Sequence, residues 1–134
     1  MFHGDFQWPS LFYSRQGKLQ AVIDWELAGV GATLNDVSWF ATFNDPSVWA
    51  DAERRCEYMP QTEELIKMYQ EAWGANLPDI NWFRALAAYK FAIITGFNLM
   101  LHRRGKRHDP MWETTKKSME TLLQRALELL ANSE

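Results

Sequence analysis

The sequence predicts an α+β fold that is mainly helical, with one short β-hairpin packed on a helical domain. The first third of the chain holds two short apolar runs around a glycine-containing turn, which favours a hairpin. The remainder holds several segments whose apolar residues recur at helical spacing. With 134 residues, of which 47% are hydrophobic, the chain is long and apolar enough for a single domain over 1–134 with one core.

The hairpin is predicted from residues 11–13 and 19–23, joined by a turn over residues 14–18 with glycine near its tip. An acidic tripeptide, Asp24-Trp25-Glu26, and a glycine-containing loop follow the second run. We therefore assign residues 1–32 to a loop and hairpin region and residues 33–134 to a helical subdomain.

Three helices are predicted in the first part of the helical subdomain. The first covers residues 33–43 and ends before Pro46, because the residue preceding a proline disfavours the helical conformation. A second, short helix is expected over residues 48–57. The third begins at Pro60, which suits a first helical turn, and stops at Gly74.

Two longer helices are predicted towards the C-terminus, over residues 79–103 and 109–131. The former is apolar on most sides, which predicts burial between neighbours. Its longest apolar run, residues 91–101, is broken by Thr95, Gly96 and Asn98 and is too short to span a bilayer, so we expect no membrane partner. The latter has an apolar stripe that we expect to be buried: Met119, Leu122, Leu123, Ala126, Leu127 and Leu130.

Charge and cysteine content restrict the class of protein. The formal net charge is -3 and both signs are interspersed, so no nucleic-acid partner is expected. The basic segment 102–108 is interpreted as a solvated helix end, with contact to an anion as the alternative. A single cysteine, Cys56, rules out an intrachain disulfide and is typical of a cytoplasmic protein.

Two short motifs carry candidate chemistry. His3-Gly4-Asp5 is followed by Ser10, and Asp24 lies at the end of the second strand run. Two carboxylates on either side of a hairpin suit phosphoryl transfer, in which one accepts the proton of the attacking hydroxyl and the other holds Mg²⁺. The tryptophans near these motifs, Trp8, Trp25 and Trp39, are interpreted as core or rim aromatics.

These motifs resemble those of the aminoglycoside-phosphotransferase and choline-kinase superfamily, whose fold is related to protein kinases. The family's catalytic loop, H-G-D-x-x-x-x-N, is matched by residues 3–10, and its metal-binding I-D-[WF]-E segment by residues 23–26. A third family segment, G-x-x-x-x-D-[LV]-[AS], is matched by residues 31–38. Three motifs in the family's order make the chain similar to the C-terminal lobe of such a kinase.

The resemblance implies a role for each matched residue. Asp5 is implied to be the catalytic base, and His3 to orient the catalytic loop. Asp24 is implied to bind Mg²⁺, with Ile23 beside it at the nucleotide. Asp36 is implied to brace the catalytic loop from a helix. The implied cofactors are ATP and Mg²⁺, and the implied substrate is a small molecule with a hydroxyl group.

The chain departs from the family in two ways. Ser10 stands where the family has asparagine. A serine hydroxyl can bind Mg²⁺, as it does in P-loops, but from a shorter side chain. The family's N-terminal lobe, which holds the nucleotide, precedes the catalytic loop and has no counterpart within these 134 residues. We therefore expect the isolated chain to show negligible phosphoryl transfer.

The helical segments are similar to one branch of this superfamily, the kinase domains found with acyl-CoA dehydrogenases. The matching stretches are residues 60–65, Tyr69, residues 80–83 and residues 90–93. This branch implies a hydroxyacyl-CoA substrate, with an aminoglycoside-like compound as the alternative.

A second function class stays open, namely a degenerate, non-catalytic kinase-like module that binds another protein. Without an N-terminal lobe, we expect an apolar surface at Phe2, Phe6, Trp8, Leu11 and Phe12. An exposed apolar surface and an open strand edge both favour association. We therefore predict a homodimer, or a larger self-assembly, formed through residues 1–25, with a monomer as the alternative.

Overall fold

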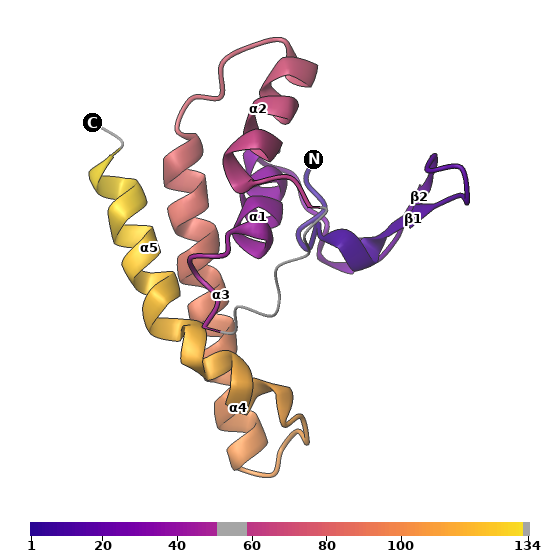
Figure 1. The fold of residues 1–134 in the computed structure, drawn as a ribbon. Helices are drawn as coiled ribbons and strands as arrows, with labels where there is room; N and C mark the ends of the chain where they lie inside the picture. The colour runs from indigo at the N-terminus through magenta and orange to yellow at the C-terminus, as the bar shows by residue number, and fades with distance from the viewer. Residues whose placement is uncertain (51–58, 133–134) are drawn as a thin grey trace.

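A computed structural model describes residues 1–50 and 59–132 of the chain. It is mainly helical with one two-stranded antiparallel sheet, which confirms the predicted α+β class (Figure 1). The principal elements are β1 (Leu11–Tyr13), β2 (Leu19–Val22), α1 (Leu34–Asn44), α2 (Thr62–Trp73), α3 (Ile80–Arg103), α4 (Met111–Thr115) and α5 (Met119–Ala131).

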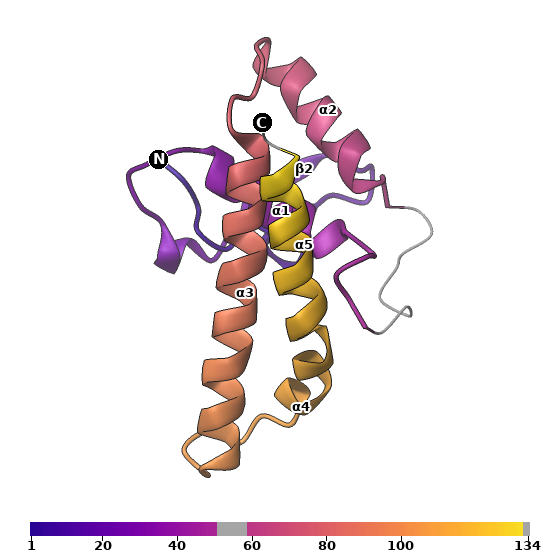
Figure 2. The ribbon, with the colours of Figure 1, turned by 90° about the vertical axis from the view of Figure 1, so that its left-hand side faces the viewer.

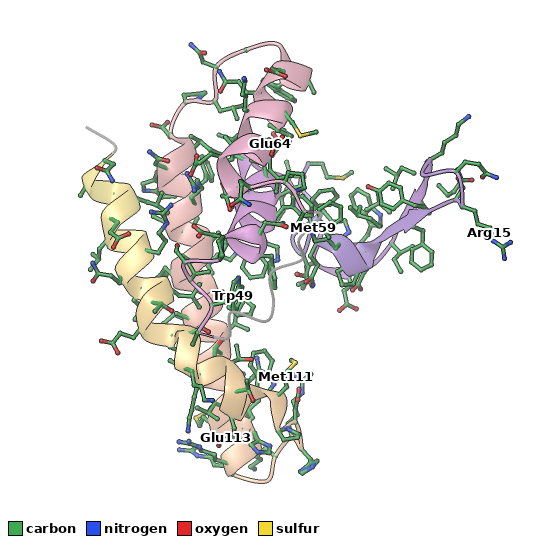
Figure 3. The ribbon with its side chains drawn as sticks, viewed as in Figure 1. Arg15, Trp49, Met59, Glu64, Met111 and Glu113 are labelled. Atoms are coloured by element: carbon green, nitrogen blue, oxygen red, sulfur yellow. The ribbon has the colours of Figure 1, made fainter. Side chains whose placement is uncertain are left out.

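The hairpin forms as predicted but does not pack on the helices. Leu11 pairs with Val22 and Tyr13 with Leu19, and Gly17 takes the positive φ of 75° that the turn requires. Both strands are too short to cover a face of the helical domain, and most of their residues are exposed. The hairpin projects away from the helices, with Arg15 at its tip (Figures 1 and 3). The loop before the hairpin makes the tertiary contacts instead.

The first helices keep close to their predicted bounds. α1 ends at Asn44, ahead of Pro46 as expected. α2 begins two residues after the predicted start because Gln61 keeps an extended conformation, with φ −65° and ψ 153°. It ends at Gly74, whose φ of 74° supplies the left-handed cap. Most of the predicted helix over 48–57 lies outside the described residues, and residues 48–50 form a turn and a bend.

The C-terminal half is built around α3, which confirms the long predicted helix. The prediction of one continuous helix over 109–131 was wrong, since a 3-10 turn, Lys116–Ser118, separates α4 from α5. The hydroxyls at this break bind the backbone of a distant turn. Ser118 accepts a hydrogen bond from the Ala50 amide at 3.0 Å, and Thr121 donates one to the Val48 carbonyl at 2.6 Å. Such side-chain bonds to backbone compete with regular helix.

The core lies where α3 packs along α5 and α1 (Figure 2). Alanines on α3 let the helices approach closely, and Leu122 on α5 is fully buried against them. Three aromatic rings complete this cluster: Trp39 of α1, Phe91 of α3 and Trp49 from the turn after α1. Figure 3 shows Trp49 beside the two long helices.

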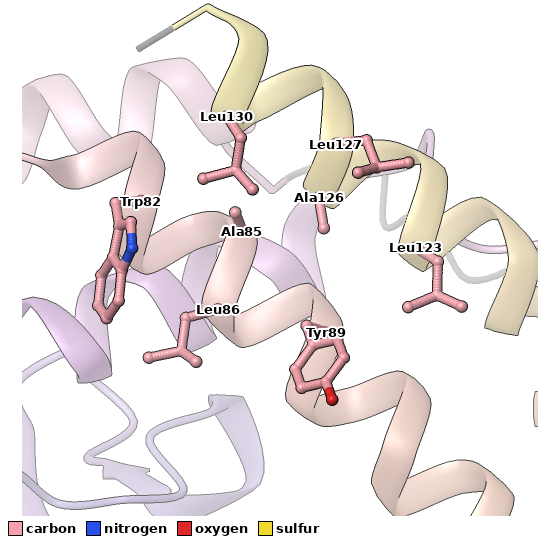
Figure 4. A pocket seen from close by; sticks show the side chains of 8 residues that line it. All are labelled: Trp82, Ala85, Leu86, Tyr89, Leu123, Ala126, Leu127 and Leu130. Atoms are coloured by element: carbon pink, nitrogen blue, oxygen red, sulfur yellow. The ribbon is translucent and has the colours of Figure 1, made fainter.

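The predicted stripe of α5 was only partly correct. Leu122 and Ala126 are buried as expected, and Leu129 joins them. Leu123, Leu127 and Leu130 are exposed. They line a shallow apolar groove between α5 and α3 (Figure 4), whose other lining residues are Trp82, Ala85, Leu86, Tyr89 and Ala126. Leu122, Ala126 and Leu129 thus belong to the core cluster, whereas the three exposed leucines face the groove.

By length and composition, α3 could cross a membrane, since one 18-residue window has a mean hydropathy of 1.2. A core helix of a soluble protein meets the same criterion. The packing of α3 along α1 and α5 fits that second interpretation, although only 33% of the window is buried. The absence of a membrane partner stays a prediction.

Candidate functional site

The first turn of α1 holds the loop that carries His3-Gly4-Asp5. The two carboxylate oxygens of Asp36 accept hydrogen bonds from the backbone amides of His3, at 2.6 Å, and of Gly4, at 2.9 Å. A carboxylate bound by two amides is strongly oriented, because charge-assisted hydrogen bonds are short and directional. Asp36 therefore orients the backbone of this loop from α1, although it lies 33 residues after His3 in the sequence.

The ring of His3 joins this loop to the end of β2. It is only 2% exposed, and its Nδ1 accepts a hydrogen bond from the Asp5 amide at 3.3 Å. Nε2 must then carry the proton, which it donates to the carbonyl of Ile23 at 2.8 Å. The ring also lies against Trp25, with 4.7 Å between ring centroids. Both ring nitrogens are occupied by protein groups, which suits a residue that orients the loop.

Gly4 permits a close approach between two loops. Its φ is 94°, and a Cβ at this position would lie 2.2 Å from the carbonyl oxygen of Leu27. No other residue fits without moving one of the two backbones. Two backbone hydrogen bonds between Phe2 and Gly29, at 2.9 and 3.0 Å, join the same two loops.

The carboxylate of Asp5 is half-buried and is held at both oxygens. Oδ1 accepts a hydrogen bond from the indole of Trp39 at 2.8 Å, and Oδ2 accepts one from the amide of Gln7 at 3.0 Å. Sequence reasoning missed both donors and treated Trp39 as a core or rim aromatic. A signal was present, because Trp39 lies three residues after Asp36 and therefore faces the same side of α1.

Ser10 and Asp24 lie on opposite sides of the hairpin base. The backbone carbonyl of Ser10 accepts a hydrogen bond from the Ile23 amide at 3.0 Å. Its hydroxyl donates to the Asp5 carbonyl at 3.4 Å, and the residue is only 3% exposed. Asp24 is exposed and has a left-handed backbone, with φ 70°. The segments of Asp5 and Asp24 are thus tied together through His3 and Ser10.

The profile of the phosphotransferase enzyme family matches residues 1–87, which include the whole of this site. The chain belongs to this family. The match confirms the predicted relation to the aminoglycoside-phosphotransferase and choline-kinase superfamily.

Curated proteins that match this chain include members of the acyl-CoA dehydrogenase family. The human acyl-CoA dehydrogenase family member 11 is 33% identical over 100 residues, and the chicken protein of that name is 29% identical over 106. These matches cover 69% and 71% of this chain but only 13% and 14% of the relatives, so the chain spans a small part of their length. No solved structure matches the chain.

Kinases of this family generally use ATP and Mg²⁺. Asp24 fits a Mg²⁺ ion, because this ion is held in kinase sites by one or two carboxylates together with substrate phosphates and water. Within residues 1–50 and 59–132, no cluster of three or more histidine, cysteine or acidic side chains could form a metal cage. The hydroxyl of Ser10 faces the Asp5 backbone, so its role as a second ligand stays a prediction.

Proposed function

We propose that this phosphotransferase chain carries the catalytic base and a metal-binding aspartate of an ATP-dependent kinase for small-molecule hydroxyl groups. The observation that carries the proposal is the Asp5 carboxylate. It is held at both oxygens, is partly accessible, and belongs to a loop that Asp36 and His3 fix in place. Phosphoryl transfer relies on positioned groups of this kind more than on covalent chemistry.

Asp5 would accept the proton of the substrate hydroxyl, and one lone pair on each of its oxygens remains for that purpose after the Trp39 and Gln7 bonds. Asp24 would hold the metal. Bound Mg²⁺ and ATP supply the transferred phosphoryl group and neutralise its charge. His3 would keep the two aspartate-bearing segments in register through its bond to Ile23.

For the substrate, we propose a hydroxyacyl-CoA. The support is the name of the relatives, which are members of the acyl-CoA dehydrogenase family. An aminoglycoside-like compound, which the wider family suggests, is the competing substrate.

Transfer of the γ-phosphoryl group from labelled ATP to either substrate tests the proposal. The chain would be assayed alone and together with an N-terminal kinase lobe, either joined to it or added as a separate chain. We expect turnover with this lobe and negligible turnover from the chain alone. Asp5→Asn should lower kcat by roughly 10²–10⁴-fold, the usual contribution of a general base. We also propose a cytoplasmic location, which labelling of the natural protein in cells would test.

A matched pair of variants tests the metal ligand. Asp24 and Asp79 are both exposed and both have a left-handed backbone, with φ 70° and 59°. Asparagine tolerates this conformation, so the change to asparagine removes only the charge. Asp24→Asn should raise the Mg²⁺ concentration required for turnover, and Asp79→Asn should not. If neither substrate is phosphorylated in the presence of the N-terminal lobe, the alternative of a non-catalytic binding module is favoured.

A further inference from the structure

Trp39 links the helical core to the catalytic loop. Its ring is only 7% exposed and lies edge-on to Phe43 and Phe91, with centroids 5.5 and 5.7 Å away. Lys90 of α3 lies over the ring, 5.3 Å from its centroid. The position of the indole is therefore set by the packing of α1 against α3, the most buried part of the molecule.

The polar edge of this ring meets the proposed base. The indole N–H lies 2.8 Å from Oδ1 of Asp5. An indole nitrogen can only donate, so Oδ1 of Asp5 is the acceptor in this bond. Gln7 binds the other oxygen of Asp5. Because Gln7 lies on the same loop, this bond does not fix the position of the loop relative to the helical core.

Buried indoles need an acceptor, and a backbone carbonyl would be enough. Trp49, in the same aromatic cluster, donates to the Phe43 carbonyl at 3.2 Å, and the more exposed Trp25 donates to the Val22 carbonyl at 2.8 Å. Trp8 donates to the side-chain oxygen of Asn44 at 3.0 Å. Trp39 donates to a side-chain carboxylate, and that carboxylate is the proposed base. The choice of acceptor separates Trp39 from an ordinary core tryptophan.

We infer that Trp39 is a positioning residue for Asp5, which sets the rotamer of the base from the helical core. This inference rests on the proposed function, because it gives Asp5 the role of base. When the N–H is lost, the Asp5 carboxylate keeps only the Gln7 bond and can rotate away from the substrate hydroxyl. Binding of substrate does not use the indole, so the loss should fall on kcat and not on KM.

Two matched variants separate this role from a packing role. Trp39→Phe and Trp49→Phe each remove one indole N–H from the same cluster while an aromatic ring remains. In the assay with the N-terminal lobe, MgATP and a hydroxyacyl-CoA, Trp39→Phe should lower kcat about tenfold at nearly constant KM. Trp49→Phe should leave kcat near the wild-type value. Thermal melting of both variants shows whether they are equally folded.

A second measurement needs no activity. Exchange of the indole N–H protons with solvent can be followed by NMR on the chain labelled with ¹⁵N-tryptophan. Asp5→Ala should accelerate exchange at Trp39 and leave exchange at Trp49 unchanged. This measurement also covers the case in which Trp39→Phe does not fold.

The outcomes separate the inference from the proposed function. If Asp5→Asn abolishes turnover but Trp39→Phe behaves like Trp49→Phe, only the positioning role is overturned. If Asp5→Asn retains full turnover, or the wild-type protein has none, both are overturned. Unchanged exchange at Trp39 in Asp5→Ala would overturn the hydrogen bond itself.

Discussion

The loop of residues 2–10 and the α3–α5 pair are held in place by different forces. Hydrogen bonds join the loop to distant segments, such as those from the backbone amides of His3 and Gly4 to Asp36 and from the His3 ring to the Ile23 carbonyl. Apolar contacts join the α3–α5 pair, and Leu122 is completely buried in the core cluster there.

The polar contacts of the loop and the apolar contacts of the helices contribute differently to orientation and to stability. Hydrogen bonds are directional, so the polar links fix where Asp5 points but contribute modestly to net stability. Apolar burial has no preferred direction but supplies most of the free energy of folding. Trp39 belongs to both regions, since its ring is in the core and its N–H is in the loop. The variants below test whether the two regions can be disrupted separately.

The largest effect is expected from Leu122→Ala. Leu122 is 0% exposed, and removal of a fully buried leucine leaves a cavity that lowers the free energy of unfolding by about 3 kcal/mol. Leu127 of the same helix is 63% exposed, so Leu127→Ala should cost less than about 1 kcal/mol. Urea denaturation measures both. Equal costs would contradict the assignment of the core to this face of α5.

Gly4→Ala should disrupt the loop and spare the helical core. The added Cβ would lie 2.2 Å from the Leu27 carbonyl oxygen at a φ of 94°. We expect a loss of about 2–3 kcal/mol, combining backbone strain with the clash. Gly17→Ala is the control, because Gly17 also has a positive φ, 75°, but has no atom within 4 Å of the added Cβ.

Only backbone strain, about 1–2 kcal/mol, should then remain for Gly17→Ala. Far-ultraviolet circular dichroism should show that Gly4→Ala keeps its helices. Indole N–H exchange at Trp39 should accelerate in this variant, since the loop that supplies Asp5 has moved. Slow exchange in Gly4→Ala would mean that the loop tolerates a side chain here.

A smaller effect is expected on self-association through the hairpin, which belongs neither to the loop of residues 2–10 nor to the α3–α5 pair. Of the apolar residues expected on this surface, Phe12 is 53% exposed, whereas Phe6 and Trp8 pack against Phe40. We propose that the open hairpin edge and Phe12 pair with a second copy. Phe12→Glu should shift light scattering of the chain towards the monomer at high micromolar concentration. A wild-type chain that stays monomeric there would end the proposal.

The smallest effect is expected from an ion pair at the far end of the helices. Hydrogen bonds from Arg103 and Lys116 lower the pKa of Glu113 to about 2, from an ordinary value of 4.5. Figure 3 shows Glu113 on α4, remote from the hairpin. Because the folded pKa is lower than the unfolded one, the stabilisation is complete above pH 4.5 and is lost as the pH falls towards 2.

Glu113→Gln should therefore lower the melting temperature slightly at neutral pH. Between pH 4.5 and pH 2, the melting temperature of this variant should fall less than that of the wild-type chain. The pair is partly exposed, so added salt should reduce the difference. Glu71→Gln is a control, because its ion pair with Lys67 is long, at 3.9 Å, and more exposed. An identical acid response of the two variants would contradict a special role for Glu113.

The sequence by itself determined the elements and the family. Local chemistry sets the ends of helices, as Gly74 does through its left-handed cap and Pro46 through the restriction it places on its neighbour. The spacing of the His3, Asp24 and Asp36 motifs was enough to predict the superfamily, because a catalytic loop, a strand end and a helix start each need specific residue types.

Tertiary structure alone decided how these pieces meet. The bond from Trp39 to Asp5 joins residues 34 apart, and no local pattern states which acceptor a buried indole will find. The buried face of α5 is the one that joins the core cluster with α1 and α3. The break after α4 coincides with hydrogen bonds to a distant turn, in which Ser118 accepts from the Ala50 amide and Thr121 donates to the Val48 carbonyl. Periodicity ranks the faces of a helix by apolarity, whereas burial depends on the shape of the partner, which the helix's own sequence does not contain.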